Sequence, residues 1–97
     1  MPAFVTLFNF TEKGILDVKQ TGTRAKAVRA AIEAAGGGFV GIWWTLGKYD
    51  GVLVSTAPDD ETVMRVLMAT GMQGNVRTMT MRAFGEEEIE SIVKGLP

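Results

Sequence analysis

The side chains best suited to chemistry in this chain lie together in the segment Trp44–Asp50, which combines an indole, a phenol and a carboxylate. Asp50 is a candidate general base, and Tyr49 could stabilise a developing negative charge or orient a polar ligand. The structural alternative is that Asp50 accepts N–H groups of a turn while the Tyr49 hydroxyl stays at the surface. Both interpretations stay open, so Asp50 and Tyr49 are weak catalytic candidates.

A second set of candidates lies at a strand predicted over residues 75–84. Thr78, Thr80 and Arg82 share one face of this strand because side chains alternate, and Arg77 falls on the other. The Arg82 guanidinium could hold a carboxylate, or could form a salt bridge with a partner subunit or with Asp50. A ring, hydroxyls, an amide and charges are typical of small-molecule pockets. The candidate ligand-binding residues are therefore Trp44, Thr45, Tyr49, Asp50, Asn75, Arg77 and Arg82.

Two absences narrow the chemistry further, because the 97 residues include no cysteine and no histidine. Disulfides, thiolate nucleophiles and zinc–thiolate sites are excluded, as are the usual general base and haem ligand. We expect no cofactor and no metal. The net charge of −1, with lysines and arginines scattered, gives no reason to expect nucleic acid or an anionic membrane as partner. No apolar run has membrane-spanning length and no leader is evident, so we expect a cytoplasmic location.

Gly36, Gly38 and Gly41 fit the spacing G-x-G-x-x-G of dinucleotide-binding loops. Such a loop needs a strand before it and a helix after it. Here a predicted helix precedes the glycines and a strand follows, so a plain helix-to-strand connection is the better interpretation.

Apolar periodicity and glycine or proline breaks predict alternating strands and helices. The chain is expected to form one domain over residues 1–97, of the α+β class. The order is that of a ferredoxin-like βαββαβ sandwich, with a four-stranded antiparallel sheet and an extra C-terminal helix. Strands are predicted over 3–10, 39–46, 50–57 and 75–84. Helices are predicted over 12–19, from Thr21 or Thr23 as cap to 35, from 58 to 71, and from 86 to 96.

Both faces of this sheet are expected to carry large apolar side chains, although helices can cover only one of them. In the second strand, Phe39 and Trp43 are predicted to share a face, opposite Trp44. An exposed apolar sheet face exceeds what monomers usually tolerate, so a homo-oligomer, a dimer or larger, is expected. The alternative is that the C-terminal helix folds over the open face, with Ile89 and Val93 as its cover. The methionines of the preceding helix, Met64, Met68 and Met72, are expected to pack in the core.

The chain resembles the GYD domain family, small bacterial and archaeal proteins that largely lack an assigned function. Gly47, Tyr49 and Asp50 form the naming motif, and Gly51 departs from a pattern that usually has a larger apolar residue, which is expected to open space there. The resemblance implies a ferredoxin-like fold similar to dimeric α+β barrel proteins, and it implies no activity. Further matching residues are Asn9, Phe10, Thr11, Gly14, Arg24, the segments 57–61 and 74–78, and 82–84.

Three functions follow as hypotheses. The first is an oligomeric, non-catalytic module that binds a small molecule between sheet and helices, near the Trp44–Asp50 corner. The second is a cofactor-independent enzyme of the dimeric α+β barrel type, with Asp50 as base and Tyr49 or Arg82 stabilising negative charge. The third is a purely structural interaction protein whose corner residues serve the subunit contact. Whether the chain is an enzyme is left open.

Overall fold

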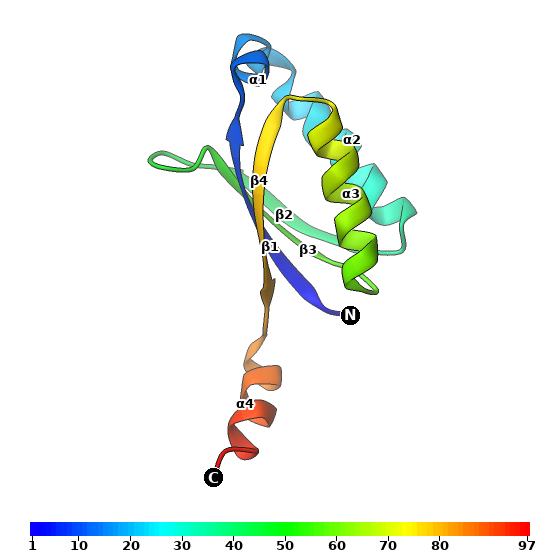
Figure 1. Ribbon diagram of the computed structural model, residues 1–97, viewed down its shortest axis with the longest axis vertical. Helices are drawn as coiled ribbons and strands as arrows, with labels where there is room; N and C mark the ends of the chain where they lie inside the picture. Colours follow the sequence, from blue (N-terminus) through cyan, green and yellow to red (C-terminus); the bar gives the residue numbers. More distant parts are fainter.

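The computed structural model describes all 97 residues and contains one antiparallel sheet with helices packed on one side (Figure 1). The predicted order of elements is confirmed, including the C-terminal helix. A short 3-10 turn over Val18–Gln20 separates the first two helices. The strands are β1 (Ala3–Phe10), β2 (Gly38–Trp44), β3 (Gly51–Thr56) and β4 (Val76–Ala83), and the helices are α1 (Glu12–Leu16), α2 (Thr21–Ala34), α3 (Asp60–Met72) and α4 (Glu86–Lys94).

The strands lie in the order β2-β3-β1-β4, and every neighbouring pair is antiparallel. In β1, Phe4 lies opposite Arg82 of β4, and Phe8 lies opposite Thr78. On its other side Phe8 lies opposite Gly51 of β3. This register fixes which face of the sheet each side chain occupies, since side chains alternate along a strand.

Side-chain caps start two of the helices. The Thr11 hydroxyl accepts the Gly14 N–H at 3.1 Å and begins α1 as predicted. Asp59 accepts the Thr62 N–H at 2.8 Å, and this bond, followed by that of the Thr62 hydroxyl, lowers the pKa of Asp59. The prediction of Thr21 or Thr23 as the cap of α2 was wrong. The 3-10 turn leads directly into α2, so Gln20 takes the cap position without a side-chain bond.

The core lies between the sheet and the two helices α2 and α3, which cover the same face (Figure 1). Its apolar residues are Phe4 and Phe8 of β1, Ile32 of α2, Leu53 of β3, and Ala57. Only nine of the 97 residues are buried, and no side chain falls below 2% exposure. Helices and sheet therefore do not close fully onto one another.

A β-bulge between Phe39 and Gly41 changes the alternation of β2. Phe39 lies opposite Ser55, on the helix-covered face, whereas Trp43 lies opposite Val52, on the other. The prediction that Phe39 and Trp43 share a face was therefore wrong, because the extra residue, Val40, shifts the strand by one position. We call the face without helices the open face; its apolar residues are Val5, Leu7, Trp43, Val52, Val54, Met79 and Met81.

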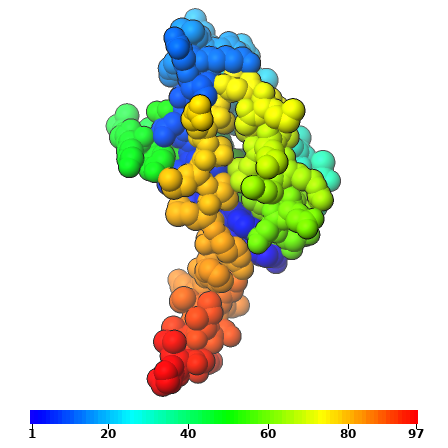
Figure 2. Space-filling view, in the orientation of Figure 1, coloured from blue at the N-terminus to red at the C-terminus, as the bar shows by residue number.

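The C-terminal helix α4 does not cover the open face. It continues the direction of β4 and projects from the body, giving the molecule a length of 52 Å (Figures 1 and 2). Its apolar side chains are all exposed and recur at helical spacing. We call Ile89, Ile92 and Val93, together with Leu96 just beyond the end of the helix, the α4 stripe.

The methionines of α3 are also at the surface, so the prediction that they pack in the core was wrong. Met64, Met68 and Met72 are 53%, 61% and 87% exposed. The side of α3 that faces the sheet is formed by Val63, Val66, Leu67 and Thr70.

Candidate functional site

The Trp44–Asp50 corner is a hairpin loop held by its own hydrogen bonds. The Thr45 N–H donates to the Asp50 carbonyl at 2.9 Å, and the Thr45 hydroxyl donates to the Tyr49 carbonyl at 2.7 Å. Gly47 has a φ of +106°, which side chains disfavour, and so permits the turn. The loop tip points away from α2 and α3 (Figure 1), and Leu46 beside Gly47 is fully exposed.

The Asp50 carboxylate joins this loop to β1. Its Oδ2 accepts the Phe10 N–H at 2.8 Å, and the Asp50 N–H donates to the Phe8 carbonyl at 2.9 Å and to the Asn9 side-chain oxygen at 3.1 Å. These bonds continue the β1–β3 ladder by one residue beyond Gly51. The carboxylate therefore has a structural partner, but this is the Phe10 N–H of the neighbouring strand and not an N–H of the turn, as the structural alternative expected.

The two rings of the corner point to opposite sides. The Trp44 indole N–H donates to the Thr21 hydroxyl at 3.0 Å, so this ring lies toward α2. The Tyr49 hydroxyl lies 3.9 Å from the Met79 sulfur, on the open face. Trp44 and Tyr49 therefore do not line a common pocket.

Arg82 and Arg77 lie at opposite ends of β4. Arg82 lies opposite Phe4, whereas Asp50 binds at Phe8 and Phe10, four to six residues along β1, or roughly 13–20 Å away. The Arg82 guanidinium donates to Glu88 at 3.0 Å and lies over the Phe84 ring, so its ion pair is with α4 and not with Asp50. Arg77, opposite Asn9, is exposed.

Glu88 forms the anchor between β4 and α4. One carboxylate oxygen accepts the Gly85 N–H at 3.2 Å, and the other accepts the Arg82 bond. The Gly85 N–H, followed by the Arg82 guanidinium, lowers the pKa of Glu88 below its ordinary value of 4.5. The carboxylate thus caps the first turn of α4 and fixes where the helix leaves the sheet.

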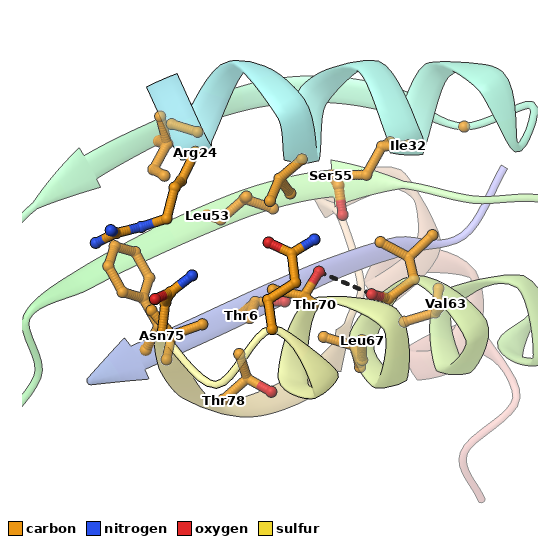
Figure 3. Close-up of a pocket in the computed structure, with 18 of the residues that line it drawn as sticks. Thr6, Arg24, Ile32, Leu53, Ser55, Val63, Leu67, Thr70, Asn75 and Thr78 are labelled. Atoms are coloured by element: carbon orange, nitrogen blue, oxygen red, sulfur yellow. Dashed lines mark hydrogen bonds between the residues drawn. The ribbon is translucent and has the colours of Figure 1, made fainter. Parts of the chain in front are cut away.

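A cavity of about 100 Å³ lies between the sheet and helices α2 and α3. Phe8, Leu53 and Val28 contribute to its largely apolar wall. Figure 3 shows Leu53, Ile32 and Leu67 around this space. A hollow between β4 and α3 is visible in Figure 2. Of the seven predicted site residues, Trp44 and Asn75 line this cavity, and Thr45, Tyr49, Asp50, Arg77 and Arg82 do not.

The polar side chains of the cavity include two that sequence reasoning did not select as site residues. Ser55 is 8% exposed on the helix-covered side of β3, and Arg24 of α2 is the one charged residue in the wall. Arg24 donates to the Asp17 carbonyl at 3.0 Å and to the Gly14 carbonyl at 3.2 Å. The signal for Ser55 was present in the sequence, because it occupies the inward position between Leu53 and Ala57 in a strand whose other inward residues are apolar.

Neither a metal site nor a membrane-spanning helix is found in the fold. No three acidic side chains come close enough to hold a metal ion. None of the helices combines the length and the apolarity that crossing a membrane requires.

Comparison with known proteins identifies relatives along nearly the whole chain. The GYD domain model matches residues 4–93. A protein of Thermus thermophilus named "Glutamine synthetase and cystathionine beta-lyase binding protein" is 34% identical over 84 residues, which cover 86% of this chain and 88% of the relative.

Two solved structures share the fold. The crystal structure of TTHA0845 from Thermus thermophilus aligns with a TM-score of 0.55 and 23% identity, over 88% of this chain and 95% of that one. The solution structure of the C-terminal domain of the MgtC protein from Mycobacterium tuberculosis also aligns with a TM-score of 0.55, at 15% identity over 84% and 86% of the two chains. At these identities the likeness concerns the fold alone.

Proposed function

The chain belongs to the GYD domain family, and from this starting point we propose that it is a non-catalytic, homo-oligomeric module that binds other proteins. The observation that carries the proposal is the apolar surface left in water on the open face and on the α4 stripe. Monomers rarely expose contiguous apolar patches above a few hundred Å². The name of the Thermus relative, a binding protein for two enzymes, supports a docking role.

The open face is the surface we assign to self-association. Trp43, Met79 and Met81 on it are 53%, 52% and 45% exposed, and the valines of β1 and β3 lie between them. The Tyr49 ring borders it through Met79. In a two-fold dimer the same patch faces itself, so sheet packs on sheet and each copy shields the other.

The α4 stripe is the surface we assign to the partner protein. Ile89, Ile92 and Val93 follow the spacing i, i+3, i+4 within α4, and Leu96 in the turn after the helix stands at i+7, a pattern that suits a helix lying in an apolar groove. Glu86, Glu87 and Glu90 flank the stripe, so the groove is expected to have a basic rim.

A small molecule held near the Trp44–Asp50 corner is the second candidate function. Trp44 and Asn75 in the cavity wall support it. The enzymatic alternative receives less support, because the Asp50 carboxylate accepts a backbone N–H and because Arg82 lies on β4, opposite the end of β1 that is remote from Asp50.

Native mass spectrometry and multi-angle light scattering test self-association. We expect at least twice the mass of the 10.5 kDa chain. Val54→Glu places a charge in the middle of the open face and should give the single chain, with its circular dichroism spectrum retained. A stable 10.5 kDa particle at high concentration of the unaltered chain would contradict the proposal.

Biolayer interferometry with glutamine synthetase and cystathionine β-lyase from the chain's own organism tests docking. Val93→Glu in α4 should weaken binding at least tenfold, since burying a valine contributes about 1.5 kcal/mol or more. Met68→Glu is the matched control, because it places the same charge on an exposed apolar residue of α3. Absence of binding to both enzymes, or equal weakening by both variants, would contradict the assignment.

A further inference from the structure

The cavity between sheet and helices is not explained by a docking role, because its wall takes no part in the open face or the α4 stripe. Apolar side chains from α2, α3 and the sheet surround it without filling it. Protein interiors are normally packed to crystal-like density, with few voids larger than a water molecule. A cavity of about 100 Å³ approaches the size of engineered apolar cavities that accept benzene.

Ser55 supplies a polar group that calls for a partner inside this space. The residue is more than nine-tenths buried and lines the cavity, and its hydroxyl takes part in none of the side-chain hydrogen bonds of the protein. No fully enclosed side-chain polar atom of the protein lacks a partner, so the Ser55 oxygen is open to the cavity and not sealed in the core. Figure 3 shows the hydroxyl pointing into the space between the helices and the sheet. The nearby Thr6, equally buried, differs because its hydroxyl pairs with that of Thr80 at 2.9 Å. A hydroxyl that is free of protein partners and open to the cavity can donate and accept, so Ser55 is suited to a hydrogen bond with a guest.

The positive charge at one end of the cavity favours a negatively charged ligand. Arg24 is the one charged residue of the wall, and the carbonyls of Gly14 and Asp17 hold its guanidinium in place. Its ion pair with Asp17 is long, at 3.6 Å, and the Asp17 side chain is 65% exposed, so the positive charge is only weakly compensated. Asn75, also in the wall, lies at the same end and offers an amide with no hydrogen bond to the protein (Figure 3).

We propose that this cavity binds a small aromatic carboxylate with a hydroxyl at the far end of its ring. The carboxylate lies at Arg24 and Asn75, the ring lies against Phe8, Leu53 and the inner side of α2, and the hydroxyl reaches Ser55. Each of the three features of the cavity, its positive end, its apolar wall and its unpaired hydroxyl, is matched by one feature of the ligand.

Nuclear magnetic resonance titration of the full-length chain tests this site with three probes. 4-Hydroxyphenylacetate carries all three features, phenylacetate lacks the hydroxyl, and 4-hydroxyphenylacetamide lacks the charge. We expect the first probe to shift the amide signals of Ser55 and Asn75 and to bind at least tenfold more tightly than either of the others.

Two substitutions test the expected contacts of Ser55 and Arg24 with the ligand separately. Ser55→Ala should remove the preference for 4-hydroxyphenylacetate over phenylacetate, and Arg24→Gln should remove the preference for acid over amide. Matched controls are Ser91→Ala on α4 and Arg29→Gln on α2, both exposed. Arg24→Gln could fail to fold, because two backbone carbonyls lose their donor. In that case the comparison of 4-hydroxyphenylacetate with phenylacetate in Ser55→Ala still tests the proposal. No shift at Ser55 with any probe, or preferences unchanged by Ser55→Ala, would overturn the proposal.

Discussion

A side chain added at Gly51 would overlap the ring of Phe8 and approach the Trp43 carbonyl oxygen to 2.7 Å. The two residues lie opposite each other on the helix-covered face of β1 and β3. The expectation that glycine opens space beyond the corner was therefore wrong, because the Phe8 ring fills that space. The pair Gly51 and Phe8 works as one unit in which a large residue is matched by the smallest.

We predict that Gly51→Ala lowers the free energy of unfolding by about 1–3 kcal/mol, the usual cost of overpacking. Urea denaturation measures it. Phe8→Leu in the same chain should recover part of the loss by giving the new methyl group room. A Gly51→Ala chain as stable as the unaltered one would show that Phe8 moves aside freely.

The hydrogen bond between the Phe10 N–H and the Asp50 carboxylate should stabilise the fold. Asp50→Ala leaves the Phe10 N–H without its acceptor and should lower the free energy of unfolding by about 1–2 kcal/mol. Asp17→Ala, at an exposed carboxylate, is the control and should change stability by less than about 0.5 kcal/mol. Equal effects of the two variants in urea denaturation would argue against the anchoring role of Asp50.

Sequence reasoning placed Trp44 and Asn75 where the cavity lies, but it grouped them with residues that the fold separates. Nearness in the chain put Tyr49 and Trp44 in one candidate site, whereas their rings point to opposite sides. The separation depends on the path of the loop around Gly47, and no local pattern encodes it. Arg24 could not be selected from the sequence, because its place at the cavity depends on how α2 packs across the sheet.

The elements themselves follow closely from the sequence, and the differences have local causes. Alternation and breaks predict four strands and the helices between them, since those signals lie within each element. The bulge after Phe39 was missed because an extra residue in a strand is set by pairing with β3. The methionines of α3 were misplaced because the hydrophobicity of a residue does not say which side of a helix meets the sheet.

The Glu88 carboxylate, which caps α4, should make the start of this helix sensitive to acid. The pKa of Glu88 is lowered in the folded chain, so its contribution to stability is present above 4.5 and is lost as the pH falls through the lowered value. We expect the amide signals of Ile89 to Val93 to move toward unfolded positions below pH 4.5. Glu88→Gln should abolish this acid-dependent step, whereas Glu87→Gln, in the same turn, should leave it unchanged. Persistence of the step in Glu88→Gln would assign it to another group.

The whole molecule is long and thin for its size, with extents of 52, 31 and 18 Å. Few residues are buried, and apolar side chains lie on the open face, on α3 and on α4. A chain of this length buries a modest fraction of its surface even when compact. Association is therefore expected to supply part of the stability that the single chain lacks.

We predict that the melting temperature rises with protein concentration. For a dimer whose folding is coupled to association, each tenfold dilution removes about 1.4 kcal/mol per dimer. Differential scanning calorimetry over a hundredfold concentration range measures this, and Val54→Glu should melt at a lower, concentration-independent temperature. A constant melting temperature for the unaltered chain would mean that the single copy is stable by itself.

The projection of α4 from the body has an evolutionary consequence. Because Arg82 and Glu88 fix the helix at its root and the rest of the helix projects from the body, substitutions further along it are expected to leave the packing of the sheet unchanged. If α4 carries the docking surface that we propose, the partner specificity of the protein can therefore change through substitutions in this helix while the rest of the fold stays the same.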